Sequence, residues 1–310
     1  MEVAALQPFD YLIPGDHAEA SALLAAGNGR VRPFMGGTDL LIRTRGGFVR
    51  PQAVVDLKGL PGMKEIRPGD DGWLIIGAAC TMNQVAMHPL VQARYDLLVQ
   101  ACNSVASYQL RNRATIGGNC CNASPAADTA PALYCLEAVA EIYGPQGIRR
   151  IPIAQFFVGP GKTALRSGEF LTSLHLPPSP QDARGVFNKL GRTKMGDISV
   201  VSVAVYRRSG RLADPTAPAT GEWRIALGAV GPTPLRAAEA EAALMQDTSP
   251  AGIRVAAALA AAAARPIDDI RASAAYRRAM VAVLARRGIE AVLADLSAAR
   301  AQLPAAGGAS

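Results

Sequence analysis

Two short segments of the sequence, each with a pair of adjacent glycines, carry the residue types that can hold a phosphate group. The first is GGTDLL at 36–41 and the second is TIGGN at 115–119. Glycines let backbone N–H groups approach an anion closely, and a helix that begins after the pair adds its partial positive charge. The alternative for the first segment is an ordinary tight turn in which Asp39 caps a helix. Two such segments about 80 residues apart fit one extended ligand with two ends, such as a dinucleotide.

Ionisable residues elsewhere could contact the same ligand. Asp128 precedes an apolar helix, so its carboxylate can cap that helix or accept a hydrogen bond from a ligand hydroxyl. The segment NKLGRTKMGDIS at 188–199 gathers four charged residues at a predicted strand end: Lys189, Arg192, Lys194 and Asp197. This group is either a solvated strand end or the border of a ligand site. At such a border a lysine could stabilise the negative charge of a reduced cofactor such as a flavin.

The cysteines do not form a metal-binding pattern. Cys120 and Cys121 are adjacent, so their side chains diverge, and a disulfide between them needs strained geometry. The sequence has no C-x₂-C repeat and only three histidines, which disfavours an iron–sulfur or zinc site, and we predict no metal. Small apolar core residues are the better interpretation. The odd total of five cysteines and the lack of a signal-peptide pattern predict free thiols in a soluble, cytoplasmic protein.

Other functional motifs are incomplete or missing. GPGKT at 159–163 looks like part of a Walker motif, but Phe156 stands where that motif requires its first glycine. The sequence contains no G-x-G-x-x-G, G-x-S-x-G or H-E-x-x-H pattern. The net charge of +7 comes from scattered residues, and aromatic residues make up only 5% of the chain, so we expect no nucleic-acid partner. No apolar stretch of 18 residues occurs, so we expect no insertion into a membrane.

The elements that must position these residues alternate between strand and helix up to about residue 175. Helical periodicity covers Asp16–Gly27, a short strand leads into the first glycine pair, and a helix opens at Thr38 or Asp39. Buried strands are expected at 52–57 and 72–79, followed by two helices separated near Pro89. The second glycine segment has little helical or strand periodicity. After a boundary near residue 178, antiparallel strands are split by a polar loop at 214–221, and alanine-rich helices extend from 237 to about 303.

Four blocks of sequence resemble, in order, the FAD-binding medium subunit of the molybdenum hydroxylases, the family of xanthine dehydrogenase and carbon monoxide dehydrogenase. They are FDYLIPGDHAEASALLA…RPFMGGTDLLIRTRGG, LRNRATIGGNCCNASPAADTAPAL, GPGKTALRSGEFLTSLHLP and DDIRASAAYRRAMVAVLARR. The resemblance implies an α+β fold with an FAD-binding domain at 1–177, made of two α/β subdomains at about 1–60 and 61–177. A C-terminal domain with a small antiparallel sheet and helices would follow at 178–288, and a helical extension with a frayed tail at 289–310.

The resemblance also assigns residues to an FAD site. It places the pyrophosphate against one segment, Arg32, Pro33, Phe34, Met35, Gly36, Gly37, Thr38, Asp39 and Leu40, and forms a second cradle from Ala114, Thr115, Gly117, Gly118 and Asn119. Asp128 would hold a ribityl or ribose hydroxyl, and Lys189 would lie near the flavin. Further positions beside the cofactor are Ala78, Phe170, Leu171, Asp197 and Ile198. Some members have a tyrosine where Ile198 stands, so this face of the flavin would be aliphatic here.

The family implies an electron-transfer subunit, not the subunit that hydroxylates the substrate, and no catalytic residue is assigned in this chain. The expected partners are a molybdopterin-binding large subunit and a small subunit with two [2Fe–2S] clusters, assembled as a dimer of heterotrimers. FAD would pass the electrons to an acceptor such as NAD⁺, oxygen or a quinone-linked carrier. Two rival functions are a self-sufficient flavin oxidase of related fold and an assembly subunit that has lost its ligand. The few histidines weigh against the first, and the intact glycine segments weigh against the second.

Overall fold

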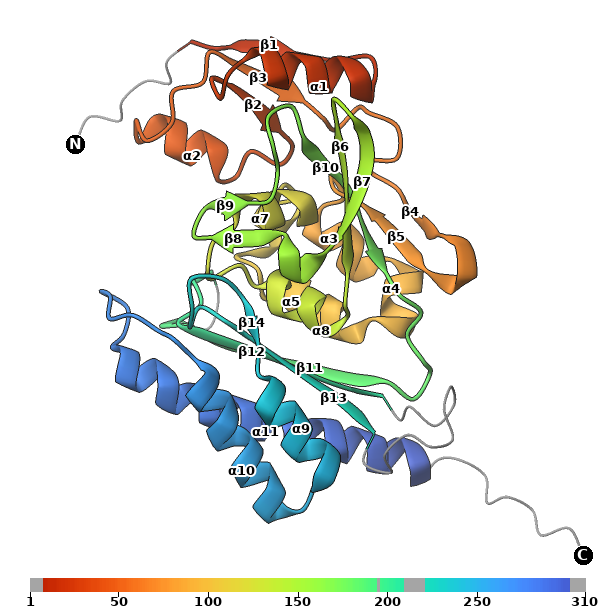
Figure 1. Cartoon of the computed structure of the whole chain (residues 1–310), viewed down its shortest axis with the longest axis vertical. Helices are drawn as coiled ribbons and strands as arrows, with labels where there is room; N and C mark the ends of the chain where they lie inside the picture. The colour runs from red at the N-terminus through yellow and green to blue at the C-terminus, as the bar shows by residue number, and fades with distance from the viewer. Residues whose placement is uncertain (1–7, 194–195, 209–220, 302–310) are drawn as a thin grey trace, which may run out of the picture.

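The described residues form three larger sheets stacked along the long axis of the chain, each with its own helices, and one small two-stranded sheet at 157–163 (Figure 1). The structure, a computed structural model, describes residues 8–193, 196–208 and 221–301. The predicted positions of Lys194, of the polar loop up to residue 220 and of the frayed C-terminal tail lie outside these ranges. No helix in the described ranges is long and apolar enough to cross a membrane.

The first sheet is small and parallel, with the strand order β1-β3-β2. Its elements are β1 (Asp10–Leu12), α1 (His17–Ala26), β2 (Val31–Phe34), α2 (Leu40–Arg45) and β3 (Ala53–Asp56). The Asp16 carboxylate caps α1 by accepting the N–H of Glu19 at 2.8 Å, which confirms the predicted helix. Helix α2 begins one residue after Asp39, whose side chain makes no capping bond. The alternative in which the Asp39 side chain caps the helix is therefore wrong, and the helix begins one residue after Asp39, the later of the two starts that we expected.

The second sheet is antiparallel, with five strands in the order β4-β5-β10-β6-β7. The strands are β4 (Ile66–Pro68), β5 (Leu74–Gly77), β6 (Val139–Gly144), β7 (Gly147–Pro152) and β10 (Phe170–Leu176). Helices α3 (Met82–Met87), α4 (Pro89–Arg94), α5 (Asp96–Ser104), α7 (Ile116–Asn122) and α8 (Thr129–Cys135) share a core with this sheet, and α6 (Tyr108–Arg111) contacts α3 and α5.

The segment 82–104 forms three helices, α3, α4 and α5, and not the predicted two. The extra break falls at Tyr95, whose backbone leaves the helical region at φ −130° and ψ 45°. The Tyr95 side chain is only 3% exposed, and its hydroxyl donates a hydrogen bond to the Pro177 carbonyl at 2.9 Å. A buried tertiary anchor thus interrupts a pattern that would otherwise run on as one helix.

The face of the second sheet that carries Glu141 holds a polar cluster. Arg150 contacts the Glu141 carboxylate at 2.7 Å, and His175 Nε2 lies 3.3 Å from it. The hydrogen bond from His175, together with Arg150, outweighs the effect of burial and lowers the pKa of Glu141 to about 2.

The third sheet is antiparallel in the order β11-β12-β13-β14, as the alternating pattern predicted. Its elements are β11 (Arg184–Leu190), β12 (Val201–Arg208), β13 (Glu222–Gly228), β14 (Leu235–Arg236), α9 (Ala238–Gln246), α10 (Pro250–Ala263) and α11 (Ala274–Ala301). Along β12, Val203 and Val205 pack against the C-terminal helices, whereas Ala204 and Tyr206 face the core of the second sheet. One strand therefore joins two hydrophobic cores, and α5 and α8 lie between the two sheets (Figure 1).

Candidate functional site

The two glycine segments lie in direct contact, although they are far apart in the sequence. A Cβ atom added to Gly36 would lie 2.2 Å from the carbonyl oxygen of Arg113 and 3.2 Å from the Cα of Ala114. The Asn122 amide, at the end of α7, donates a hydrogen bond to the Asp39 carboxylate at 3.1 Å. The turn before α2 and the segment leading into α7 thus form one continuous surface, as the hypothesis of a single ligand requires.

The first segment presents unused hydrogen-bond donors. Within the described residues, the backbone N–H groups of Gly36, Gly37, Thr38 and Asp39 donate no hydrogen bond. Gly37 has a φ of 73°, a conformation that other residues rarely adopt. Gly36, Gly37 and Thr38 are half-buried, so these donors are neither sealed in the core nor fully in water. Such a row of backbone donors before a helix fits the phosphate groups of a dinucleotide.

The residues before the first glycine pair belong mostly to β2. Arg32 and Pro33 are exposed, whereas Phe34 and Met35 are buried beneath the turn. Leu40 is the first residue of α2 and is half-buried.

The second segment is a helix, which the sequence did not suggest. Helix α7 contains both glycines, and Thr115 caps it by accepting the Gly118 N–H at 3.1 Å. The N–H of Gly117 donates to the Ala78 carbonyl at 2.9 Å, and the N–H of Asn119 donates to the Thr115 carbonyl at 3.0 Å. These N–H groups already donate hydrogen bonds within the protein. The second segment, all of which the structure describes, therefore lacks the row of free backbone donors that we expected.

The glycines of α7 serve close packing instead. A Cβ atom on Gly117 would lie 2.5 Å from Ala78 Cβ and 2.6 Å from the Ala78 carbonyl oxygen. Ala78 itself is fully buried beneath this helix. Asn119 is half-buried and accepts a hydrogen bond from Thr129 at 2.7 Å through its Oδ1 atom, which directs its amide nitrogen away from Thr129. The side chain of Asn119, not the backbone, is the group that this segment can offer to a ligand.

The neighbouring cysteines are packing residues in the structure. Cys120 is fully buried in the core, and burial raises its pKa well above the ordinary value. Cys121 is half-buried beside Leu171, and burial raises its pKa to about 12. All five cysteines are free. Both thiols are therefore protonated at neutral pH, as expected of small core side chains.

Phe170 and Leu171 lie on the central strand β10, and both are 1% exposed. The Phe170 ring stacks against His17 of α1 with centroids 6.0 Å apart and lies 5.9 Å from the Tyr143 ring. Its side chain thus joins the first and second sheets and offers no free face to a ligand. Leu171 lies beside Cys121 of α7 and is the better placed of the two predicted residues.

Asp128 and Lys189 meet at the junction of the second and third sheets. Lys189 Nζ donates to the Asp128 carboxylate at 2.6 Å and to the Ser104 carbonyl at 2.9 Å, and the Ser199 hydroxyl donates to Asp128 at 2.5 Å. Burial raises the pKa of Asp128, and the charge and hydrogen bond of Lys189 oppose this rise. Asp128 makes no capping bond to α8, so that alternative is wrong.

Asp197 and Ile198 follow β11 at the edge of the third sheet. The Asp197 carboxylate accepts the N–H groups of Arg192, Thr193 and Ile198 at 2.5, 3.3 and 2.9 Å, so it shapes its own loop. Ile198 is 57% exposed and presents an aliphatic surface. Ile198 is accessible, whereas the Asp197 side chain is only 9% exposed, and no described contact links either residue to the glycine segments.

The GPGKT segment is a hairpin, not a phosphate-binding loop followed by a helix. It spans β8 (Phe157–Gly159) and β9 (Lys162–Thr163), with Gly161 in the turn at a φ of 67°. This confirms that the segment is no Walker motif.

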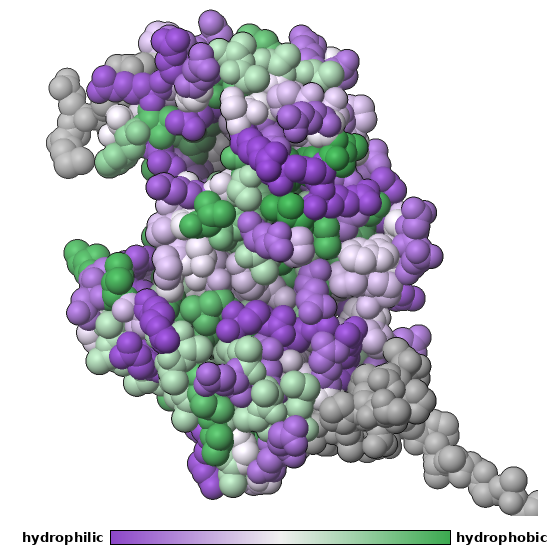
Figure 2. Space-filling model, viewed as in Figure 1, coloured by the Kyte–Doolittle hydropathy of each residue, from purple (hydrophilic) through white to green (hydrophobic). Residues whose placement is uncertain are grey.

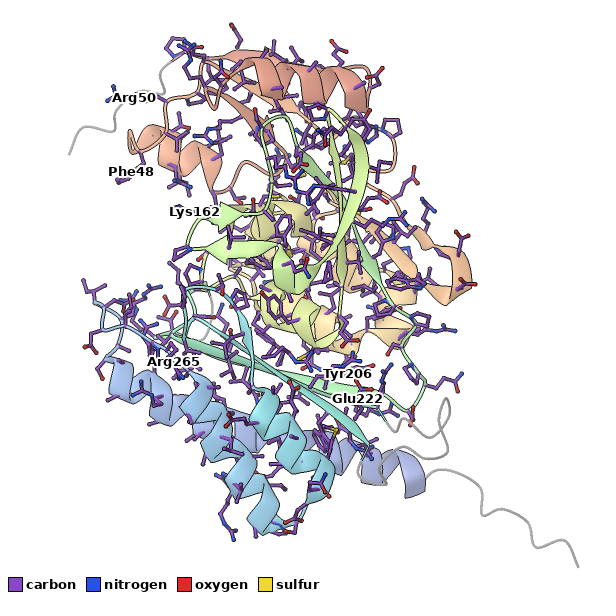
Figure 3. The ribbon with its side chains drawn as sticks, viewed as in Figure 1. Phe48, Arg50, Lys162, Tyr206, Glu222 and Arg265 are labelled. Carbon is purple, nitrogen blue, oxygen red and sulfur yellow. The ribbon has the colours of Figure 1, made fainter. Side chains whose placement is uncertain are left out.

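Figure 3 shows Lys162 on the same side of the molecule as Phe48, near the first sheet, and Arg265, beside the third. Figure 2 shows hydrophilic and hydrophobic side chains interspersed over this face of the molecule.

Sequence reasoning missed three residues of this region: Arg113, Asn122 and Ser199. The backbone carbonyl of Arg113 contacts Gly36, and this contact does not depend on the side chain at position 113. Asn122 and Ser199 bind carboxylates that are distant in sequence, at separations of 83 and 71 residues. No local pattern carries such a signal, because each contact joins segments that are far apart in the sequence.

Comparison with known proteins agrees with this architecture. Residues 7–179 match the family model of the FAD-binding domain in molybdopterin dehydrogenase, and residues 186–292 match that of the CO dehydrogenase flavoprotein C-terminal domain. The chain is 35% identical to the xanthine dehydrogenase FAD-binding subunit of Escherichia coli O157:H7 over 70% of this chain and 73% of that one. It is 32% identical to the carbon monoxide dehydrogenase medium chain of Hydrogenophaga pseudoflava over 92% of this chain and 97% of that one.

Solved structures give the same result. Carbon monoxide dehydrogenase from Hydrogenophaga pseudoflava matches with a TM-score of 0.87 and 32% identity, over 94% of this chain and 99% of that chain. Quinoline 2-oxidoreductase from Pseudomonas putida 86 matches with a TM-score of 0.85 and 27% identity, also over 94% and 99%. The fold, the two matched domains and these relatives together show that the chain belongs to the family of FAD-binding subunits of the xanthine and carbon monoxide dehydrogenase type of molybdenum hydroxylases, which are oxidoreductases.

Proposed function

We propose that the chain holds FAD across the contact between the 36–40 turn and α7, and that it is the electron-output subunit of a molybdenum hydroxylase. The observation that carries the proposal is the row of unused N–H groups at Gly36–Asp39, packed directly against the second glycine segment. A pyrophosphate needs several convergent donors that no protein group already occupies. This turn offers them, and the residues present therefore fit the cofactor of the family.

The two segments would contribute to FAD binding in different ways. The turn would bind the pyrophosphate through its backbone, because its donors are free. Helix α7 would form a wall against the cofactor, since its own donors are used, and Asn119 would supply a side-chain amide. The glycines of α7 bring this wall close to the second sheet, where Gly117 packs on Ala78.

The far end of the cofactor would approach Asp128, Lys189 and Ile198, beside the junction with the third sheet. We expect Asp128 to bind a ligand hydroxyl with a carboxyl group that Lys189 holds in place. The Lys189 ammonium is held by Asp128 and Ser104, so its N–H groups have a fixed position beside the proposed site of the ring. Ile198 would offer an aliphatic contact to the ring.

Bound FAD would supply the ability to take up electrons one at a time and release them in pairs. The chain's own contribution is to bind, orient and partly shield the cofactor. We propose that the electrons come from two [2Fe–2S] clusters of a small subunit, which receives them from a molybdopterin-binding large subunit, in a dimer of heterotrimers. The relatives named as medium chains support such an assembly. We also retain the prediction of a cytoplasmic location, which suits five free thiols.

The test is to purify the full chain, record its visible spectrum and identify the cofactor released by acid. FAD at one per chain is expected, and a chain that binds no FAD would refute the proposal. Metal analysis of the complex purified from its native source then separates the proposed subunit from a self-sufficient oxidase. Molybdenum and iron in co-purifying chains support the former, and a homomeric flavoprotein that oxidises a substrate alone supports the latter.

A further inference from the structure

The turn that offers the free N–H groups rests on an aromatic ring. A Cβ atom on Gly37 would lie 2.7 and 2.9 Å from two carbons of the Phe34 ring. Phe34 is the last residue of β2 and is 9% exposed. The backbone of the turn at Gly37 lies directly against this ring. A shift of the ring would therefore move the free N–H donors of the turn.

Two side chains hold the ring. The Lys58 ammonium lies 4.5 Å from the ring centroid, and the Tyr11 ring meets Phe34 edge to face, with centroids 5.9 Å apart at an angle of 73°. Both contacts are favourable for the charge distribution of an aromatic ring. The Phe34 ring is thus held by specific contacts with Lys58 and with Tyr11.

One carboxylate fixes both of these side chains. Asp56, at the end of β3, accepts the Lys58 ammonium at 2.5 Å and the Lys58 N–H at 2.9 Å through Oδ1, and it accepts the Tyr11 hydroxyl at 2.5 Å through Oδ2. Burial opposes ionisation of Asp56, but the hydrogen bonds from Lys58 and Tyr11 outweigh it and lower its pKa. Burial and Asp56 raise the pKa of Tyr11 to about 12, so the hydroxyl remains a donor at neutral pH.

We propose, on the basis of the FAD site proposed above, that Lys58 is a positioning residue for the pyrophosphate-binding turn, acting with Tyr11 and Asp56 through the Phe34 ring. The charge of Lys58 is neutralised by Asp56 at 2.5 Å, so Lys58 acts on the turn through geometry and not as a ligand of the phosphate. The ends of β2 and β3 lie side by side in the parallel sheet, where Phe34 is paired with Asp56, so the support comes from the same sheet edge as the turn.

The experiment measures FAD dissociation constants for the full-length apoprotein by quenching of flavin fluorescence, at several salt concentrations. Lys58→Met keeps the length of the side chain but loses the cation over the ring and the bond to Asp56. We expect it to raise the dissociation constant about 5-fold to 30-fold, from the combined loss of the cation–π contact and the ordering of the ring. Lys58→Arg keeps a cation over the ring and should restore binding to within about threefold of the wild type.

Two further variants keep the result interpretable. Lys64→Met removes the same charge from an exposed position and should bind FAD like the wild type. Tyr11→Phe keeps the ring edge but removes the hydroxyl that anchors Asp56, and should weaken binding about twofold to fivefold even if Lys58→Met folds poorly. The salt dependence of FAD binding should be the same in Lys58→Met and in the wild type, because a direct contact with phosphate would be screened by salt.

Two results would overturn the inference: equal FAD affinity for Lys58→Met and Lys64→Met, or a weaker salt dependence in Lys58→Met, which would make Lys58 a phosphate ligand. Failure of the underlying FAD site gives a different pattern. In that case the wild type binds no FAD, or a change at Gly37 itself leaves binding intact.

Discussion

Gly37→Ala is the most direct test of the turn, because it adds one methyl group at the point where backbone geometry and ring contact coincide. Gly37 has a φ of 73°, and an L-residue in the left-handed region costs about 1–2 kcal/mol. The added Cβ would lie 2.7 Å from a carbon of the Phe34 ring, whereas ordinary contact begins at 3.4 Å. The turn or the ring must therefore move by about 0.7 Å, since a packed interior has no spare space.

This displacement exceeds the roughly 0.5 Å within which a binding constellation keeps its function. We expect at least one hydrogen bond from the turn to a phosphate oxygen to be lost. A hydrogen bond to a charged group contributes about 1.5–3 kcal/mol, which corresponds to about a 10-fold to 150-fold increase in the dissociation constant for FAD. The free energy of unfolding of the apoprotein should fall by about 1–2 kcal/mol from the left-handed backbone and by about 1–3 kcal/mol from the contact with the ring.

The assay pairs FAD titration with thermal unfolding of the apoprotein, and the chain offers a matched control. Gly29 has a φ of 79°, and nothing lies within 4 Å of the position that a Cβ would take. Gly29→Ala should therefore lose only the backbone contribution of about 1–2 kcal/mol and keep wild-type affinity for FAD. If Gly37→Ala binds FAD within twofold of Gly29→Ala, the turn does not hold the pyrophosphate and the argument from its free donors fails.

Three further predictions concern residues around the site and the sheet beneath it. Cys120→Ala and Cys121→Ala should leave the visible spectrum and the metal content of the chain unchanged, and a loss of iron absorbance in either variant would contradict their role as packing residues. Asp128→Asn should lower the free energy of unfolding by about 3–5 kcal/mol, because it leaves the Lys189 charge buried and unpaired. In denaturant unfolding, a double variant with Lys189→Met should recover part of this loss, and strict additivity would argue against the ion pair. The pKa of Glu141 is lowered from 4.5 to about 2, so its stabilising effect is complete above pH 4.5 and is lost as the pH falls toward 2. Melting temperatures over this range should fall more steeply for the wild type than for Glu141→Gln, and parallel curves would show that Glu141 is not coupled to folding.

Much of the fold could be predicted because its signals are local. The Asp16 cap lies three residues from the N–H that it accepts, and the strand, glycine turn and helix at 31–45 follow one another without a long connection. The alternation along β12 likewise identified an antiparallel strand before any partner was known. Errors arose where tertiary contacts override local preference. Tyr95 breaks a helix because its side chain is anchored elsewhere.

Helix α7 illustrates the same limit within the site. Two adjacent glycines have poor helix propensity, and the sequence therefore indicated an open loop with free donors. The helix forms because Gly117 can pack against Ala78 where no other residue fits, and because Thr115 caps it. This difference affects the proposed function. The N–H groups that we expected to be free in the second segment already donate hydrogen bonds, so the proposal depends on the free N–H groups of the first segment.

The sequence alone determined the class of fold, the presence of two glycine segments and the resemblance to FAD-binding subunits, because these depend on residue types and short spacings. Only the tertiary structure decided that Gly36 touches Arg113, that Lys189 neutralises Asp128 across 61 residues of sequence, and that Phe34 supports Gly37. Such contacts depend on where the sheets place distant segments. Residue types state what each side chain can do, but only the packing of the chain decides which groups meet and which donors are left free for a ligand.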